Sequence, residues 1–145
     1  MNSEQSECSL GGVTEQDRDI ITGIRFSIGG FPEGYTYITI EKEEDGALVR
    51  VQQMPIRGGS IDDRRIPLPE WQELVDALYS RMHLCEWKEK YVDARVLDGT
   101  QWHLDITLTG DRTKSYLGCN AYPPQWGELS EILGNIAGKP DIVIR

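Results

Sequence analysis

The chain has few of the residues that mark secreted, membrane-spanning or metal-binding proteins. Its 145 residues include three cysteines and two histidines. The cysteines are odd in number and lack the paired spacing of a disulfide framework or a zinc site. No run of about 18 apolar residues could form a membrane span, and the first residues lack the pattern of a signal peptide. We therefore expect a cytoplasmic protein with reduced thiols that has no membrane segment, metal or cofactor.

Basic side chains are also scarce. Fifteen lysines and arginines stand against 24 aspartates and glutamates, which gives a formal charge of −9. Because such a surface repels the phosphate backbone, we expect no nucleic-acid partner. A basic protein partner is compatible with this charge, although acidity also keeps many cytosolic proteins in solution.

Large apolar side chains are abundant enough for a packed core. The sequence is 39% hydrophobic and contains four tryptophans and six tyrosines, which suits one domain of this length. Residues 1–18 contain only isolated apolar side chains and are predicted to form a flexible N-terminal tail. Residues 19–145 are predicted to form a single α+β domain.

Alternation of apolar and polar side chains predicts six β-strands. Asp45-Gly46 and Asp98-Gly99 are typical two-residue hairpin turns between neighbouring strands. The polar, glycine-rich stretch 55–67 is predicted to be a loop, and residues 141–145 to add a short edge strand. The six strands are expected around residues 24–28, 35–43, 47–54, 92–96, 102–108 and 112–117.

Two segments have the periodicity of amphipathic helices. The first starts near Pro69 and ends near Leu84, and the second starts at Pro123-Pro124 and ends before Gly138. The apolar face of a sheet must be buried against other elements. We therefore predict a two-layer sandwich in which both helices pack on an antiparallel sheet, in the order βββα-βββα. The stripe of the first helix comprises Trp71, Leu74, Val75, Leu78 and Met82, and that of the second comprises Trp126, Leu129, Leu133 and Ile136.

Three polar side chains form the best candidate for chemistry. His103 and Asp105 lie two residues apart in one predicted strand, and Cys119 ends the next one. A cysteine nucleophile needs a neighbouring base and donors for an oxyanion. Cys119 alternatively lies in a purely structural turn, flanked by Gly118 and Asn120.

A second candidate is the turn before the second predicted helix, which combines aromatic residues with two prolines. Asn120 and Tyr122 are its candidate binding residues, because a rigid aromatic turn can form a recognition surface. The same residues can equally form a helix entrance, in which Tyr122 packs against the first helical turn and Trp126 enters the core.

Residues 97–102 (LDGTQW) and 118–124 (GCNAYPP) resemble a pattern that recurs in small bacterial proteins. The pattern reads Asp-Gly-x-x-Trp and then Gly-x-Asn-x-x-Pro before a closing helix. The resemblance implies a bacterial cytosolic domain, and it implies no particular activity.

The sequence therefore favours a non-enzymatic protein–protein interaction domain, for example an immunity-type or antitoxin-like inhibitor of a basic partner. The alternative is a small hydrolase or ligand-binding domain that uses His103, Asp105 and Cys119. The chain is expected to be a monomer or a homodimer, and an exposed strand edge would provide the dimer contact.

Overall fold

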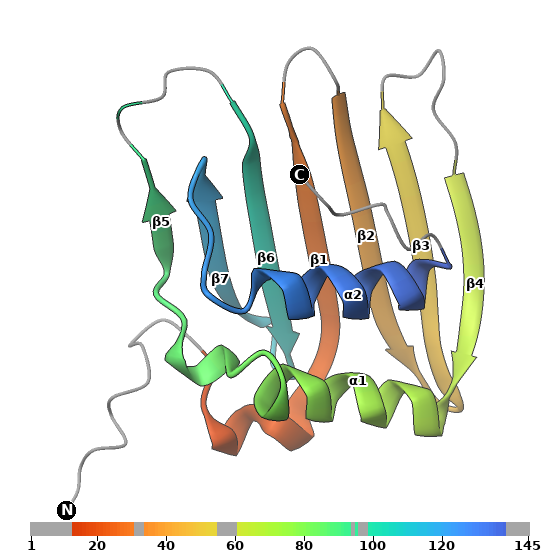
Figure 1. Cartoon of the computed structure of the whole chain (residues 1–145). Coiled ribbons are helices and arrows are strands. Elements are labelled where there is room, and N and C mark those ends of the chain that lie inside the picture. Colours follow the sequence, from red (N-terminus) through yellow and green to blue (C-terminus); the bar gives the residue numbers. More distant parts are fainter. Residues whose placement is uncertain (1–12, 31–33, 55–60, 94, 96–98, 139–145) are drawn as a thin grey trace, which may run out of the picture.

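The computed structural model describes residues 13–30, 34–54, 61–93, 95 and 99–138. Within these residues, seven strands form one mixed sheet in the order β4-β3-β2-β1-β6-β7-β5 (Figure 1). Neighbouring strands are antiparallel except β5, which runs parallel to β7. The strands are β1 (Ile21–Gly30), β2 (Gly34–Glu43), β3 (Gly46–Met54), β4 (Ile61–Pro67), β5 (Lys90–Val92), β6 (Gln101–Leu108) and β7 (Arg112–Cys119).

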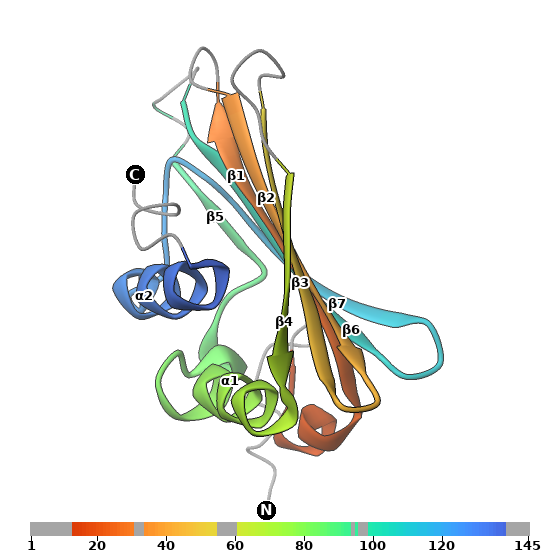
Figure 2. The ribbon, with the colours of Figure 1, turned by 90° about the vertical axis from the view of Figure 1, so that its right-hand side faces the viewer.

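Two helices, α1 (Leu68–Ser80) and α2 (Trp126–Ala137), lie on the same side of this sheet (Figure 2). Short 3-10 turns, η2 (Glu15–Ile20) and η4 (Leu84–Glu86), precede β1 and follow α1. The predicted α+β class is confirmed, and so is the apolar stripe of the first helix, because all five of its side chains are at most 6% exposed. The helix itself ends at Ser80, and the chain turns at His83, which has a left-handed backbone with φ of 52°.

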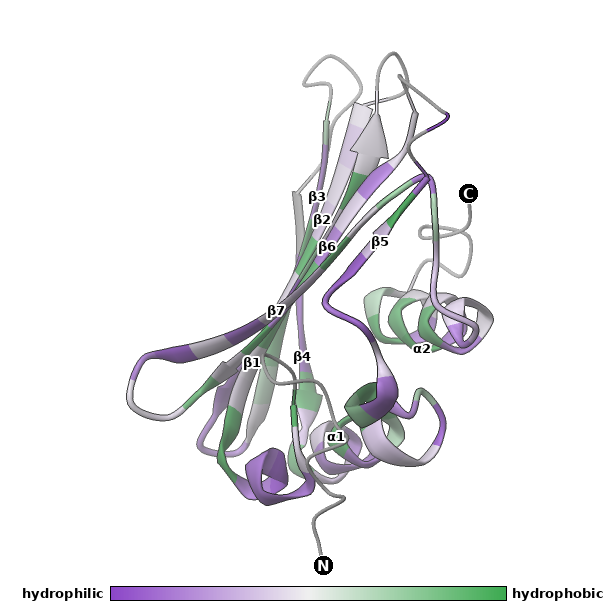
Figure 3. Cartoon of the chain, turned by 90° about the vertical axis from the view of Figure 1, so that its left-hand side faces the viewer, coloured by the Kyte–Doolittle hydropathy of each residue, from purple (hydrophilic) through white to green (hydrophobic). Residues whose placement is uncertain are grey.

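The core lies between the sheet and the helices. Buried and exposed residues alternate along the central strands, and Figure 3 shows how hydrophobic and hydrophilic residues are distributed along the sheet and the helices. Ile24, Phe26 and Ile28 of β1 are at most 2% exposed, and Leu104 and Ile106 of β6 are fully buried. Burial of each such side chain stabilises the fold by about 1.5–3 kcal/mol.

Strand β4 lies where the sequence predicts a loop, so four strands precede α1 in the described residues and the predicted βββα-βββα order is not seen there. It pairs with β3 at the edge of the sheet. An edge strand tolerates charges that a central strand would not. Asp63 accepts two hydrogen bonds from Arg50 at 2.9 and 3.1 Å, and Arg64 donates to the carbonyl of Ile136 at 3.0 Å. Polarity alone therefore did not distinguish a loop from a charged edge strand.

Strand β5 also departs from the prediction, which made it a hairpin partner of β6. It instead pairs in parallel with β7, and the Leu117 N–H donates to the carbonyl of Glu89 at 2.9 Å. Trp87, just before β5, is 1% exposed, and its indole N–H donates to the carbonyl of Met82 at 2.8 Å. Burial of this indole holds the chain beside β7. Residues 96–98 and the predicted edge strand 141–145 lie outside the described residues.

The described part of the predicted N-terminal tail is packed against the domain. Val13 is fully buried, and its N–H donates to the hydroxyl of Tyr116 at 2.8 Å. The hydroxyl of Tyr79 donates to the carbonyl of Thr14 at 2.8 Å. The prediction of a flexible tail is therefore wrong from Val13 onward, because contacts with distant residues supply the burial that the local sequence lacks.

Candidate functional site

The face of the sheet opposite α1 and α2 has no cover from any described helix (Figure 2). In its central row, Arg25 of β1 lies between Thr39 of β2 and Asp105 of β6. Side chains at alternate strand positions point to one face. Ser27, two residues along from Arg25 and paired with Tyr37 and His103, therefore shares this surface. A hollow of about 250 Å³ opens there. It is lined by Arg25, Phe26, Ser27, Tyr37, Thr39, His103 and Asp105.

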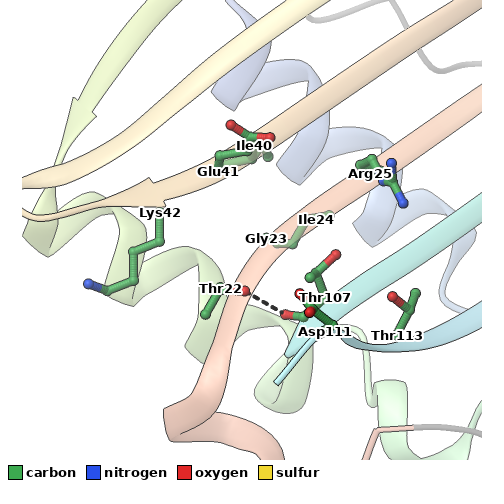
Figure 4. A pocket seen from close by; sticks show the side chains of 10 residues that line it. All are labelled: Thr22, Gly23, Ile24, Arg25, Ile40, Glu41, Lys42, Thr107, Asp111 and Thr113. Atoms are coloured by element: carbon green, nitrogen blue, oxygen red, sulfur yellow. Dashed lines mark hydrogen bonds between the residues drawn. The ribbon is translucent and has the colours of Figure 1, made fainter. Parts of the chain in front are cut away.

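A second hollow, of about 440 Å³, lies over Gly23 (Figure 4). Gly23 has no side chain to fill this part of the central strand, and a Cβ there would lie 3.3 Å from the carbonyl oxygen of Ile40 and 3.6 Å from Cβ of Thr107. The neighbouring Thr22 sits in a bulge of β1 and donates to the carbonyl of Thr107 at 3.3 Å. The lining residues are Thr22, Gly23, Ile24, Arg25, Ile40, Glu41, Lys42, Thr107, Asp111 and Thr113.

Both hollows have Arg25 in their lining, so they lie on either side of this residue along the central strand. We call the two hollows together the β1 groove, with Gly23 and Ser27 at its floor, Arg25 between them, and residues of β2 and β6 at its two sides. Small floor residues make the depression, because a larger side chain at Gly23 or Ser27 would fill it.

Two exposed tyrosines stand on the β2 side of the groove. Tyr35 is 38% exposed and Tyr37 is 41% exposed. Their rings stack with centroids 6.3 Å apart and an interplanar angle of 22°. Such rings combine a large apolar surface with a hydroxyl, a combination that is frequent in protein interfaces.

Arg25 and Arg50 differ in their ion pairing, although both lie on this face. The hydrogen bonds from Arg50 to Asp63 lower the pKa of the Asp63 carboxyl. In the described part of the chain, the Arg25 guanidinium has no ion pair, even though Asp105 is its cross-strand neighbour. The central guanidinium of the groove is therefore available to a group from outside.

The structure brings His103 and Asp105 together on the side of this groove, but not Cys119. Cys119 is paired with Gln101, one row beyond His103, and it lines neither hollow. It is half-buried, and its Sγ lies 4.0 Å from Nδ2 of Asn120. The alternation of β6 is the sequence signal that places His103 and Asp105 on one face.

Asn120 and Tyr122 have internal partners. The side-chain oxygen of Asn120 accepts from the Thr100 N–H at 2.9 Å, and the Asn120 N–H donates back to the Thr100 carbonyl at 2.9 Å. Asn120 is left-handed, with φ of 58°, a conformation that asparagine adopts more readily than most residues. The Tyr122 ring lies 4.7 Å from the Trp126 ring at the start of α2. These contacts give both residues a structural role at the helix entrance.

Sequence reasoning missed Arg25, Tyr37 and Gly23 as site residues. Alternation alone identified the polar face of each strand, but no local signal indicated that β1 pairs with β6 across most of the chain. The neighbours of Arg25 became visible only with the strand order.

No protein-family model and no curated protein matches the chain. Among the residues that the structure describes, no group of three or more His, Cys, Asp or Glu side chains could hold a metal ion. Within the same residues, no helix is both long and apolar enough to cross a membrane.

Proposed function

We propose that the chain is a protein–protein interaction domain that uses the β1 groove and the Tyr35–Tyr37 pair as its contact surface. In this proposal the domain has two layers, and α1 and α2 form the supporting layer. The observation that carries it is a sheet face that no described helix covers, on which stacked exposed tyrosines stand beside an arginine that has no ion pair among the described residues.

The composition of the surface supports binding of a protein. Tyrosine and arginine are enriched among residues that contribute most to interface affinity. The β4 edge is a less suitable contact, because Asp63, Arg64 and Arg65 are exposed along it, and charges on an edge strand oppose strand-to-strand association.

The charges around the groove favour a basic partner. Glu41, Asp105 and Asp111 contribute three carboxylates, against the two cations Arg25 and Lys42, and the whole chain carries a formal charge of −9. Complementary charge accelerates association and selects partners. An immunity-type or antitoxin-like inhibitor of a basic protein remains the concrete version of this proposal.

The test is site-specific photo-crosslinking in the native host at physiological salt. A photoreactive amino acid at position 37 should crosslink one stoichiometric partner, whereas the same group at the exposed position Glu73 on α1 should not. Tyr37→Ala should abolish recovery of that partner, and the control Glu73→Ala should retain it, with both folds checked by circular dichroism. Crosslinks from Glu73 alone, or full recovery with Tyr37→Ala, would contradict the proposal.

A second candidate function is binding of a small polar ligand in the hollow of about 250 Å³, which contains both His103 and Asp105. Cys119 has no part in this version, because it does not line the hollow. A small molecule that raises the melting temperature of the wild type but not of His103→Ala would support it. Equal stabilisation of both proteins would count against it.

A further inference from the structure

Two arginines occupy equivalent places on the open sheet face. Thr39 of β2 is paired with Arg25 on one side and with Arg50 on the other. Arg50 is held by Asp63 through two hydrogen bonds, so its guanidinium already has a bidentate carboxylate partner. Within the described residues, Arg25 has no ion pair.

The surroundings of Arg25 are rich in hydrogen-bond donors. The hydroxyls of Ser27, Thr39 and Tyr37 and the imidazole of His103 line the same hollow. Asp105 is the one carboxylate in that lining, and it makes no ion pair with Arg25 in the described structure. Guanidinium groups bind carboxylates through two parallel hydrogen bonds, and such charge-assisted bonds are roughly twice as strong as neutral ones.

The charges beyond the hollow restrict what can lie next to that carboxylate. Glu41 and Asp111 line the hollow on the Gly23 side together with Lys42, whereas Asp105 is the cross-strand partner of Arg25 itself. The floor from Gly23 to Ser27 is about 13 Å long at a rise of about 3.3 Å per residue, which is the length of a short extended peptide. A cation on the Gly23 side of the bound carboxylate would meet Glu41 and Asp111.

We propose that Arg25 is the anchor for an aspartate or glutamate side chain of the partner, and that a basic residue lies on the Gly23 side of this acid in an extended segment that occupies the β1 groove. The inference rests on the proposed function, because the occupant is a segment of the protein that the groove binds. It specifies the chemistry of that segment: a carboxylate with a cation on its Gly23 side, which a peptide with lysine on both sides of the acid supplies in either chain direction.

The probe is an acetylated peptide amide, Lys-Ala-Glu-Ala-Lys, titrated into the ¹⁵N-labelled full chain. We expect saturable shifts of the Arg25 Nε–H and of the backbone amides of Ser27 and His103. The peptide with glutamine in place of glutamate should bind roughly tenfold more weakly, because it loses the charge-assisted pair.

Arg50→Gln is the matched control, since it removes an arginine from the same row and should leave peptide binding unchanged. Arg25→Gln should weaken binding roughly tenfold, and Arg25→Lys should give an intermediate loss because lysine keeps the charge without the bidentate geometry. Amide-shift dispersion confirms that each variant is folded.

Equal binding of the glutamate and glutamine peptides, or unchanged binding by Arg25→Gln, would overturn the assignment. So would inorganic phosphate shifting the same resonances as strongly as the glutamate peptide at equal concentration, because the site would then bind anions without preference for a peptide. Loss of the native partner in Tyr37→Ala with full retention in Arg25→Gln would refute the carboxylate anchor and leave the interaction proposal standing.

Discussion

Gly118→Ala tests the packing of Gly118 against Trp102, two residues of the Asp-Gly-x-x-Trp and Gly-x-Asn-x-x-Pro pattern. Gly118 lies directly against the indole of Trp102, and a Cβ there would overlap Nε1 and Cε2 of that ring and lie 2.7 Å from the carbonyl oxygen of Ala121. Trp102 is fully buried, and its indole N–H donates to that same carbonyl at 2.9 Å. The indole therefore cannot move away from an added methyl group without losing its hydrogen bond.

The expected cost follows from these two contacts. Overpacking of a close-packed core costs about 1–3 kcal/mol, and loss of the Trp102 hydrogen bond adds about 1 kcal/mol. Together they predict that Gly118→Ala lowers the free energy of unfolding by about 2–4 kcal/mol, out of a total of about 5–15 kcal/mol for a typical domain.

Gly127→Ala is the matched control. Gly127 lies in α2, is exposed, and would place its new Cβ in open space. Alanine restricts the unfolded chain and favours the helix, so this variant should gain up to about 1 kcal/mol. The same substitution is thus expected to lower the free energy of unfolding at position 118 and to raise it at position 127.

Urea unfolding followed by tryptophan fluorescence measures both effects. With a slope of about 1–3 kcal/mol per molar urea, Gly118→Ala should lower the midpoint by about 0.7–4 M. A free energy within about 0.5 kcal/mol of the wild type would refute the reasoning, because surface substitutions typically have effects of that size. It would mean that Gly118 is not needed to accommodate the Trp102 indole.

Three further substitutions test separate contacts by the same unfolding assay. Burial raises the pKa of Tyr79 above its ordinary value of 10.0, so the stability that the neutral phenol contributes is present below that pH and is lost as the pH rises further. Tyr79→Phe also loses the hydrogen bond to Thr14, but between about pH 9 and 11 its free energy of unfolding should fall less than that of the wild type. Equal losses in the two proteins would count against this effect of burial. The buried indole N–H of Trp126 has no acceptor in the described structure, so Trp126→Phe should cost about 1 kcal/mol less than Trp102→Phe; equal costs would contradict that view. Asn120→Ala should cost about 1–3 kcal/mol, because it leaves the half-buried Thr100 N–H without its side-chain acceptor, and a neutral result would contradict a structural role for Asn120.

The sequence by itself determined which segments are regular and which of their faces are dry. The stripe from Trp71 to Met82 and the alternation of Ile24, Phe26 and Ile28 are buried as predicted. These features follow from local periodicity, because a helix repeats every 3.6 residues and a strand every 2.0. His103 and Asp105 could be assigned to one face for the same reason.

Only the tertiary structure decided which strands are neighbours. The pairing of β1 with β6, the edge position of β4 and the parallel pairing of β5 join segments whose local patterns do not encode a partner. Arg25 meets His103 and Tyr37 only because β1 lies between β6 and β2. Periodicity predicts which face of a strand or helix is buried. The choice of the neighbouring strand depends instead on packing and hydrogen bonding across the whole sheet.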